Sequence, residues 1–129
     1  MDAFWGWHGT LGLSVVVVNA LVGLLLIKAR KESAPVPAGL KAVAYLGQAL
    51  LLVQVLIGLD LWGHGARPSS SGVWSWLHML LPIGALLFTV MLLVRMRKQP
   101  VREHAASLSK GAWHTASVAV VTYLIGLLA

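Results

Sequence analysis

Four long apolar stretches decide what this chain of 129 residues can fold into. They cover approximately residues 7–27, 40–62, 73–94 and 111–128, and as helices rising about 1.5 Å per residue they can cross about 30 Å of hydrocarbon. Because unpaired backbone groups are costly in lipid, and because the runs are too long for barrel strands, they predict transmembrane helices. The sequence therefore predicts one all-α domain over residues 1–129, an integral membrane four-helix bundle with up-down-up-down topology.

Composition supports a protein that lies in the lipid bilayer and excludes several other classes. Hydrophobic residues make up 58% of the chain and charged residues 11%, whereas a soluble domain carries about 25% charged residues. The chain has no Cys, which excludes disulfides, thiolate metal sites, iron–sulfur clusters and covalently attached haem. Any redox cofactor must therefore be held noncovalently.

Positive charge is concentrated in two of the three linkers, which predicts the topology and argues against a nucleic-acid partner. Because basic loops stay inside, we expect the first and third linkers in the cytoplasm and both termini outside, in a bacterial plasma membrane. Indole rings favour the outer boundary that this topology assigns to them. The basic residues are Lys28, Arg30, Lys31 and Lys41, then Arg95, Arg97, Lys98, Arg102 and Lys110; the indoles are Trp5, Trp7, Trp62, Trp74 and Trp76.

Two of the five histidines are placed to act together. His8 opens the first helix and His78 opens the third, both on the outer side, so they lie at the same depth. The first and third helices of such a bundle are parallel and lie diagonally across the core. Two facing imidazoles of this kind predict the axial ligands of one b-type haem iron near the outer surface.

Compact residues follow both histidines on their own helix faces, where a flat ring needs space. Gly12 follows His8 by four residues, and Pro82 and Ala85 follow His78 by four and seven. We expect Gly12 and Ala85 to pack against the haem ring.

The second linker supplies polar groups on the side where haem propionates would emerge. Arg67 and His64 are the predicted propionate-side residues, together with the serines at 69–71. Asp60 is a candidate acceptor for the second nitrogen of a ligand histidine.

The other polar residues of the helices predict less specific roles. His114 lies about one helix length from the histidine pair and is interpreted as a boundary or quinone-site residue, so quinone is a second candidate cofactor. His104 lies in the basic third linker and is expected to be solvated. Asn19, Thr89 and Gln54 lie near midspan, where such groups tie helices together.

The order of these segments resembles one half of the haem A synthase family. The residues are Trp7-His8-Gly9-Thr10-Leu11-Gly12, then Gln54-Val55-Leu56-Ile57-Gly58, then Leu77-His78-Met79-Leu80. The resemblance implies a haem pocket with one ligand histidine on each flanking helix. The family has two fused halves, an acidic residue close before the substrate-side histidine and its extra helix first; this chain is half as long, has Trp5-Gly6-Trp7 there and has its extra helix last. The haem pocket therefore carries over and synthase catalysis does not.

These observations predict an electron-transfer subunit rather than an enzyme acting alone. The sequence has no paired carboxylates, phosphate-binding glycine loop or zinc-protease helix. We expect a small cytochrome b subunit of a respiratory or photosynthetic complex, working with other membrane subunits on the quinol or periplasmic-carrier side. The alternatives are a cofactor-free accessory subunit with interfacial histidines, a quinone or other metal contact, and a small transporter, which the absence of internal symmetry disfavours.

Overall fold

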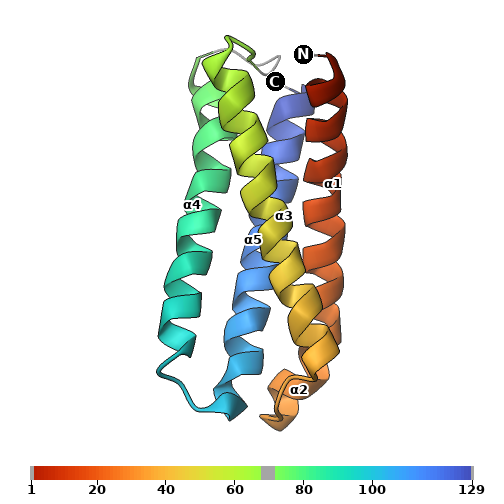
Figure 1. Cartoon of the computed structure of the whole chain (residues 1–129), viewed down its shortest axis with the longest axis vertical. Coiled ribbons are helices and arrows are strands. Elements are labelled where there is room, and N and C mark those ends of the chain that lie inside the picture. Colours follow the sequence, from red (N-terminus) through yellow and green to blue (C-terminus); the bar gives the residue numbers. More distant parts are fainter. Residues whose placement is uncertain (1, 68–71, 129) are drawn as a thin grey trace.

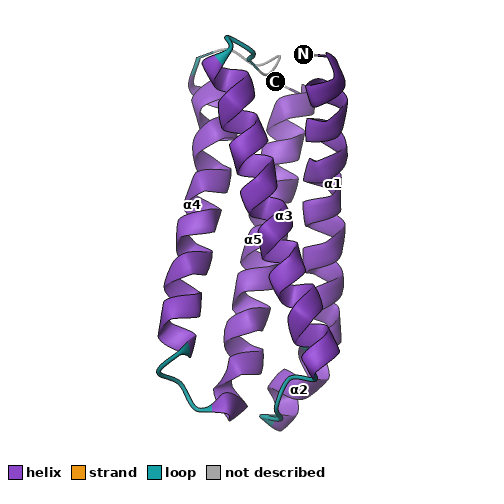
Figure 2. Cartoon of the chain, in the orientation of Figure 1, coloured by secondary structure: helices purple, strands orange, loops and turns teal. Residues whose placement is uncertain are grey.

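The computed structural model describes residues 2–67 and 72–128, and it is a bundle of long helices. The long helices are α1 (Asp2–Leu25), α3 (Ala38–Gly63), α4 (Val73–Met96) and α5 (His104–Leu128). A short helix α2 (Ile27–Glu32) continues α1 after a turn at Leu26, and a 3₁₀ turn η1 (Val101–Glu103) precedes α5. The long helices alternate in direction, and the described residues form no strand (Figures 1 and 2). The predicted all-α up-down-up-down bundle is confirmed.

Three segments of the described chain are long and apolar enough to cross a membrane. They are Gly6–Glu32, Ala38–Gly63 and Val73–Met96. Helix α5 is less apolar and is not among them, but it has 25 residues and runs the full height of the bundle beside the others (Figure 1). The fourth crossing predicted for residues 111–128 therefore rests on the length and position of α5.

Small side chains on α5 let its neighbours approach closely. Helix α1 packs against α3 and α5, and α4 packs against α5 and α3, so α1 and α4 lie diagonally opposite each other. Ala105, Ala112, Thr115 and Ala116 of α5 are buried. Lipid tails are as apolar as leucine, so close packing of small residues replaces the hydrophobic drive between helices. This packing brings α1 and α4 to the two sides of one core, as the sequence predicted.

The third linker is shorter than predicted because α5 begins at His104 rather than near residue 111. Lys110 consequently lies in a helix, and His104 is half-buried rather than solvated. Its Nε2–H donates to the carbonyl oxygens of Met96 at 3.0 Å and Gln99 at 3.2 Å. The imidazole thus caps the turn that follows α4, where the Met96 carbonyl also accepts from the Gln99 N–H at 3.1 Å.

A polar cluster joins all four long helices near midspan, and we define it as Asn19, Gln48, Thr89 and Thr115. Gln48 Nε2 donates to Asn19 Oδ1 at 3.3 Å and to Thr115 Oγ1 at 3.2 Å, and Thr89 Oγ1 donates to Gln48 Oε1 at 2.9 Å. The prediction that Asn19 and Thr89 join helices is confirmed, because both form hydrogen bonds to a side chain of another helix. Gln48, and not the predicted Gln54, is the side chain from α3 that joins them, and the Gly47 carbonyl of α3 also accepts from Asn19 Nδ2 at 3.2 Å.

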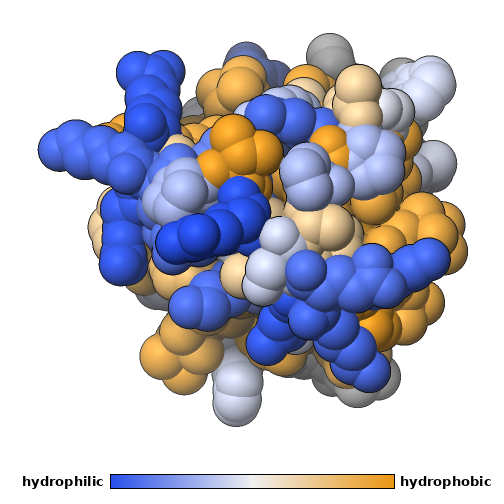
Figure 3. Space-filling view, turned by 90° about the horizontal axis from the view of Figure 1, so that it is seen from below, coloured by the Kyte–Doolittle hydropathy of each residue, from blue (hydrophilic) through white to orange (hydrophobic). Residues whose placement is uncertain are grey.

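The two ends of the bundle differ in charge. Both chain termini and the loop after α3 lie at one end, which we call the terminal end (Figure 1). Helix α2 and the connection from α4 to α5 lie at the opposite, basic end, where hydrophilic residues gather in Figure 3. Of the ten Lys and Arg residues, only Arg67 belongs to the terminal end. The fold thus separates charge along its long axis.

Candidate functional site

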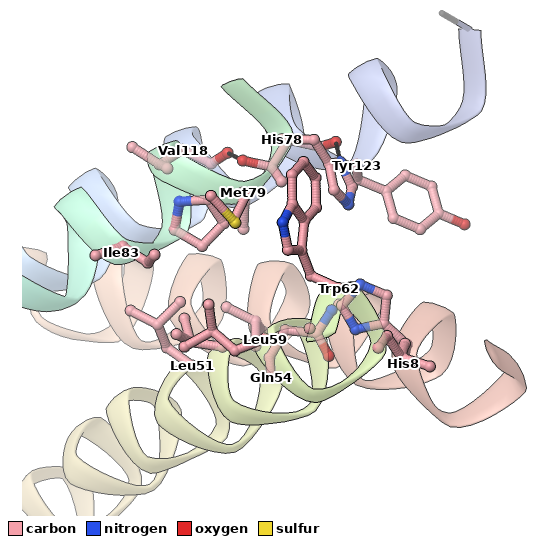
Figure 4. Close-up of a pocket in the computed structure, with 18 of the residues that line it drawn as sticks. His8, Leu51, Gln54, Leu59, Trp62, His78, Met79, Ile83, Val118 and Tyr123 are labelled. Atoms are coloured by element: carbon pink, nitrogen blue, oxygen red, sulfur yellow. Dashed lines mark hydrogen bonds between the residues drawn. The ribbon is translucent and has the colours of Figure 1, made fainter. Parts of the chain in front are cut away.

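His8 of α1 and His78 of α4 face each other across a cavity at the terminal end of the bundle. Their ring centroids are 6.2 Å apart and the ring planes are inclined by 67°. Both side chains are half-buried, and both line a cavity of about 90 Å³ (Figure 4). The two histidines therefore lie at one depth on diagonal helices, as predicted.

The spacing of the two rings suits a single metal ion between them. A metal–imidazole bond is about 2 Å long and a ring centre lies about 1 Å behind its nitrogen, so two imidazoles on opposite sides of one ion have centres about 6 Å apart. The observed 6.2 Å matches this distance. The separation of the two ring centres is therefore compatible with coordination of one ion by both imidazoles.

The backbone of α5 orients the His78 ring. Its Nδ1–H donates to the carbonyl oxygen of Thr122 at 2.9 Å, and the Thr122 hydroxyl in turn donates to the carbonyl of Val118 at 2.8 Å (Figure 4). This bond places the proton on Nδ1 and leaves the Nε2 lone pair free for a metal, the arrangement usual for metal-ligating histidines. Asp60, the acceptor considered from sequence, lies beside exposed His64 instead.

Each imidazole lies over a glycine of a neighbouring helix. A Cβ atom added to Gly126 of α5 would be 2.8 Å from His78 Cε1, and one added to Gly58 of α3 would be 3.2 Å from His8 Cε1. The first distance is shorter than real Cβ contacts, and the second is tight. The two glycines therefore make the space that the rings occupy.

We expect Gly126→Ala to destabilise the protein by about 1–3 kcal/mol, because the added methyl overpacks a ring that its bond to Thr122 holds in place. Unfolding in mixed micelles measures the effect. Gly84→Ala on α4 is the matched control, because nothing lies within 4 Å of its new Cβ. That variant should be neutral or up to about 1 kcal/mol more stable, since alanine is the better helix former. Equal stability of the two variants would contradict the glycine assignment.

One of the two residues predicted to pack against the haem ring lines the cavity. Gly12 lines it, together with Pro82. Ala85 does not: it is 1% exposed and packs in the core with Val15 and Leu51, which line the cavity themselves. The side chain of Ala85 is thus covered by residues of α1 and α3 and does not reach the cavity surface.

Of the two predicted propionate-side residues, only Arg67 reaches the cavity. Its guanidinium lies 3.8 Å from the ring centre of Trp62 and donates to the carbonyls of Trp62 and Ala66. His64 is exposed, its Nδ1 lies 2.8 Å from the Asp60 carbonyl, and it does not line the cavity. The serines at 69–71 lie outside the described residues, as does the side chain of Trp5.

Several cavity residues have no distinctive sequence signal. Trp62, predicted only as a boundary residue, lines the cavity and packs against Trp76, with ring centroids 5.2 Å apart. Thr122 and Tyr123 of α5 line it as well. They follow from the register of α5 against α4, which the hydropathy pattern alone does not determine.

His114 lies inside the bundle rather than at its boundary. Its ring stacks on Phe88 with centroids 4.0 Å apart, and it neighbours Thr115 of the polar cluster in sequence. The boundary prediction was wrong because α5 starts earlier than expected, which moves His114 several turns away from the basic end.

The donor set suits an iron macrocycle better than a protein-only metal site. Within residues 2–67 and 72–128, no group of three or more His, Cys, Asp or Glu side chains could hold a metal ion. A haem requires only two axial ligands, since its ring supplies the other four. The cavity has room for several water molecules, and a macrocycle, being larger, requires the side chains at the mouth to move apart. No family model, curated protein or solved structure matches this chain significantly.

Proposed function

We propose that this protein is a small membrane b-type cytochrome subunit that holds one haem b through His8 and His78. The observation that carries the proposal is the 6.2 Å separation of the two ring centres across a cavity within a helical membrane bundle. The bond from His78 to the Thr122 carbonyl supports it, because it leaves Nε2 of His78 available to iron. The resemblance of three segments to half of a haem A synthase points to the same pocket.

Bound haem iron would supply one-electron cycling between the ferrous and ferric states. The protein supplies the axial imidazoles, an apolar surround that includes Val15 and Leu51, and one cation, Arg67, at the mouth. The cavity lies near one end of the bundle, so the site serves electron exchange at one face of the membrane rather than transfer across it. We propose a subunit of a respiratory or photosynthetic complex, exchanging electrons with a quinol or a periplasmic carrier.

A haem titration of the purified full chain in detergent tests the proposal. We expect one haem per chain, a low-spin spectrum in both redox states, and a reduced-minus-oxidised difference spectrum of the b type. A folded, helical chain that retains no haem after the excess haem has been removed would overturn it. So would a high-spin spectrum, because two axial imidazoles produce low-spin iron.

The proposed orientation places the basic end in the cytoplasm of a bacterial cell, because positively charged loops are retained inside. The chain has no native Cys, so single cysteines can report it directly. Gly63 at the terminal end has open space around its Cβ position, and Val101 at the basic end is 59% exposed. We expect an impermeant maleimide to label Gly63→Cys in intact cells and Val101→Cys only after permeabilisation. The reverse pattern would contradict the orientation.

A further inference from the structure

Two buried polar atoms beside the cavity have no hydrogen-bond partner within the described chain. They are Nδ1 of His8 and Oε1 of Gln54, and both residues line the cavity. The other ligand candidate, His78, has its Nδ1 paired with the Thr122 carbonyl. Buried polar groups in native proteins are almost always satisfied by protein or by ordered water. The His8 side of the site therefore lacks the partner that the His78 side has.

The packing of α1 against α3 places these two side chains next to each other. His8 lies over Gly58 of α3, with 3.2 Å from its Cε1 to the Cβ that Gly58 lacks. Gln54 lies over Gly12 of α1, with 3.1 Å from its Nε2 to the corresponding position. His8 and Gly12 are four residues apart, as are Gln54 and Gly58, so each large side chain fills the gap left by a glycine on the other helix. The imidazole and the carboxamide consequently lie side by side at the cavity wall (Figure 4).

We propose that Gln54 is the positioning residue for His8, acting through an ordered water molecule in the cavity. In this arrangement His8 Nδ1–H donates to the water, and the water donates to Gln54 Oε1. Because both atoms are closed to a water-sized probe, the water requires a small rotation of these side chains that opens them to the adjoining cavity of about 90 Å³. The proton is then fixed on Nδ1 of His8, and its Nε2 lone pair is free, as in His78. The proposal rests on the proposed function where it concerns haem, whereas the tautomer of His8 is a property of the haem-free protein.

The two ligand histidines thus differ in whether a substitution can remove the hydrogen-bond acceptor that sets the basicity of the ring. The acceptor for His78 is a backbone carbonyl, which no substitution removes, whereas the acceptor for His8 is a side chain. A stronger acceptor makes an axial imidazole more basic, which stabilises ferric iron and lowers the reduction potential. Gln54 therefore sets the electronic properties of the site from the α3 side.

Nitrogen-15 NMR of the haem-free protein, labelled at histidine, tests the tautomer. We expect His8 of the wild type to carry its proton on Nδ1, and Gln54→Leu to convert it to a mixture of tautomers. Gln54→Glu, with a stronger acceptor, should keep the Nδ1–H form. Gln99→Leu at the basic end is the control and should leave the His8 signals unchanged, since Gln99 contacts Ser107 far from the cavity. An unaltered His8 tautomer in Gln54→Leu would overturn the proposal.

The haem-loaded variants provide an independent readout. Gln54→Leu should raise the midpoint potential and weaken haem binding by roughly 10–100-fold, whereas Gln54→Glu should lower the potential. A potential that does not change in either variant would also overturn the assignment to Gln54. If the wild type binds no haem, the proposed function fails, and the NMR result still decides whether Gln54 positions His8.

Discussion

We expect His8→Ala and His78→Ala each to abolish the low-spin haem spectrum. The two imidazoles come from diagonally opposite helices and share one cavity, so no other described histidine can replace either of them. His64 is exposed outside the cavity, and His104 and His114 lie farther along the bundle. Loss of one axial bond leaves at most weak, high-spin binding. Haem titration followed by electron paramagnetic resonance measures both affinity and spin state.

His64→Ala is the matched control for this experiment, because it removes a histidine at the same end of the bundle without touching the cavity. It should retain the wild-type spectrum. A second variant distinguishes loss of the ligand from misfolding. His8→Gly should regain a low-spin haem spectrum when free imidazole is added, since the added ring can occupy the space over Gly58. A wild-type spectrum in His8→Ala or His78→Ala would exclude the bis-histidine site.

Gln48→Leu should cause the largest loss of stability, about 2–4 kcal/mol. Gln48 exchanges hydrogen bonds with Asn19 of α1, Thr89 of α4 and Thr115 of α5. Such bonds between membrane helices contribute about 0.6–2 kcal/mol each. Leucine would leave Thr89 and Thr115 without their α3 partner, and Asn19 would keep only its bonds to the carbonyls of Val15 and Gly47. Reversible unfolding in mixed micelles measures the change.

Ser14→Ala provides the control for the polar cluster. The Ser14 hydroxyl bonds only to the carbonyl of Thr10 in its own helix, so its loss should change stability by less than about 0.5 kcal/mol. If Gln48→Leu unfolds at the same denaturant fraction as Ser14→Ala, the polar cluster does not hold the helices together. A large effect with an intact haem spectrum would show that the cluster and the histidine site act independently.

The two glutamines of α3 show a property that the sequence alone does not determine, which is the direction in which each side chain of the helix points. Both lie in one helix that was predicted with nearly correct ends, and both are polar residues in an apolar run. The sequence suggested Gln54 as the helix tie, whereas the structure uses Gln48 for that role and turns Gln54 toward the cavity. A helix that is apolar on all sides has no pattern that reveals which side faces the core. The rotation of α3 about its own axis was therefore not predictable.

Length and hydropathy alone determined that this chain forms four long helices, and distance along the helices determined that His8 and His78 share one depth. Lipid enforces both results, because it requires backbone hydrogen bonds to close within each helix and the rise per residue then sets every height. Only the tertiary structure decided which atoms complete the site. The Thr122 carbonyl is a backbone group with no sequence signature, and Gly58 and Gly126 receive the imidazoles only in one register of the helices. The packing of α5 against α1 and α4 sets that register, because the small side chains of α5 allow close contact. The hydropathy pattern does not reveal the register, because these helices are apolar on all sides.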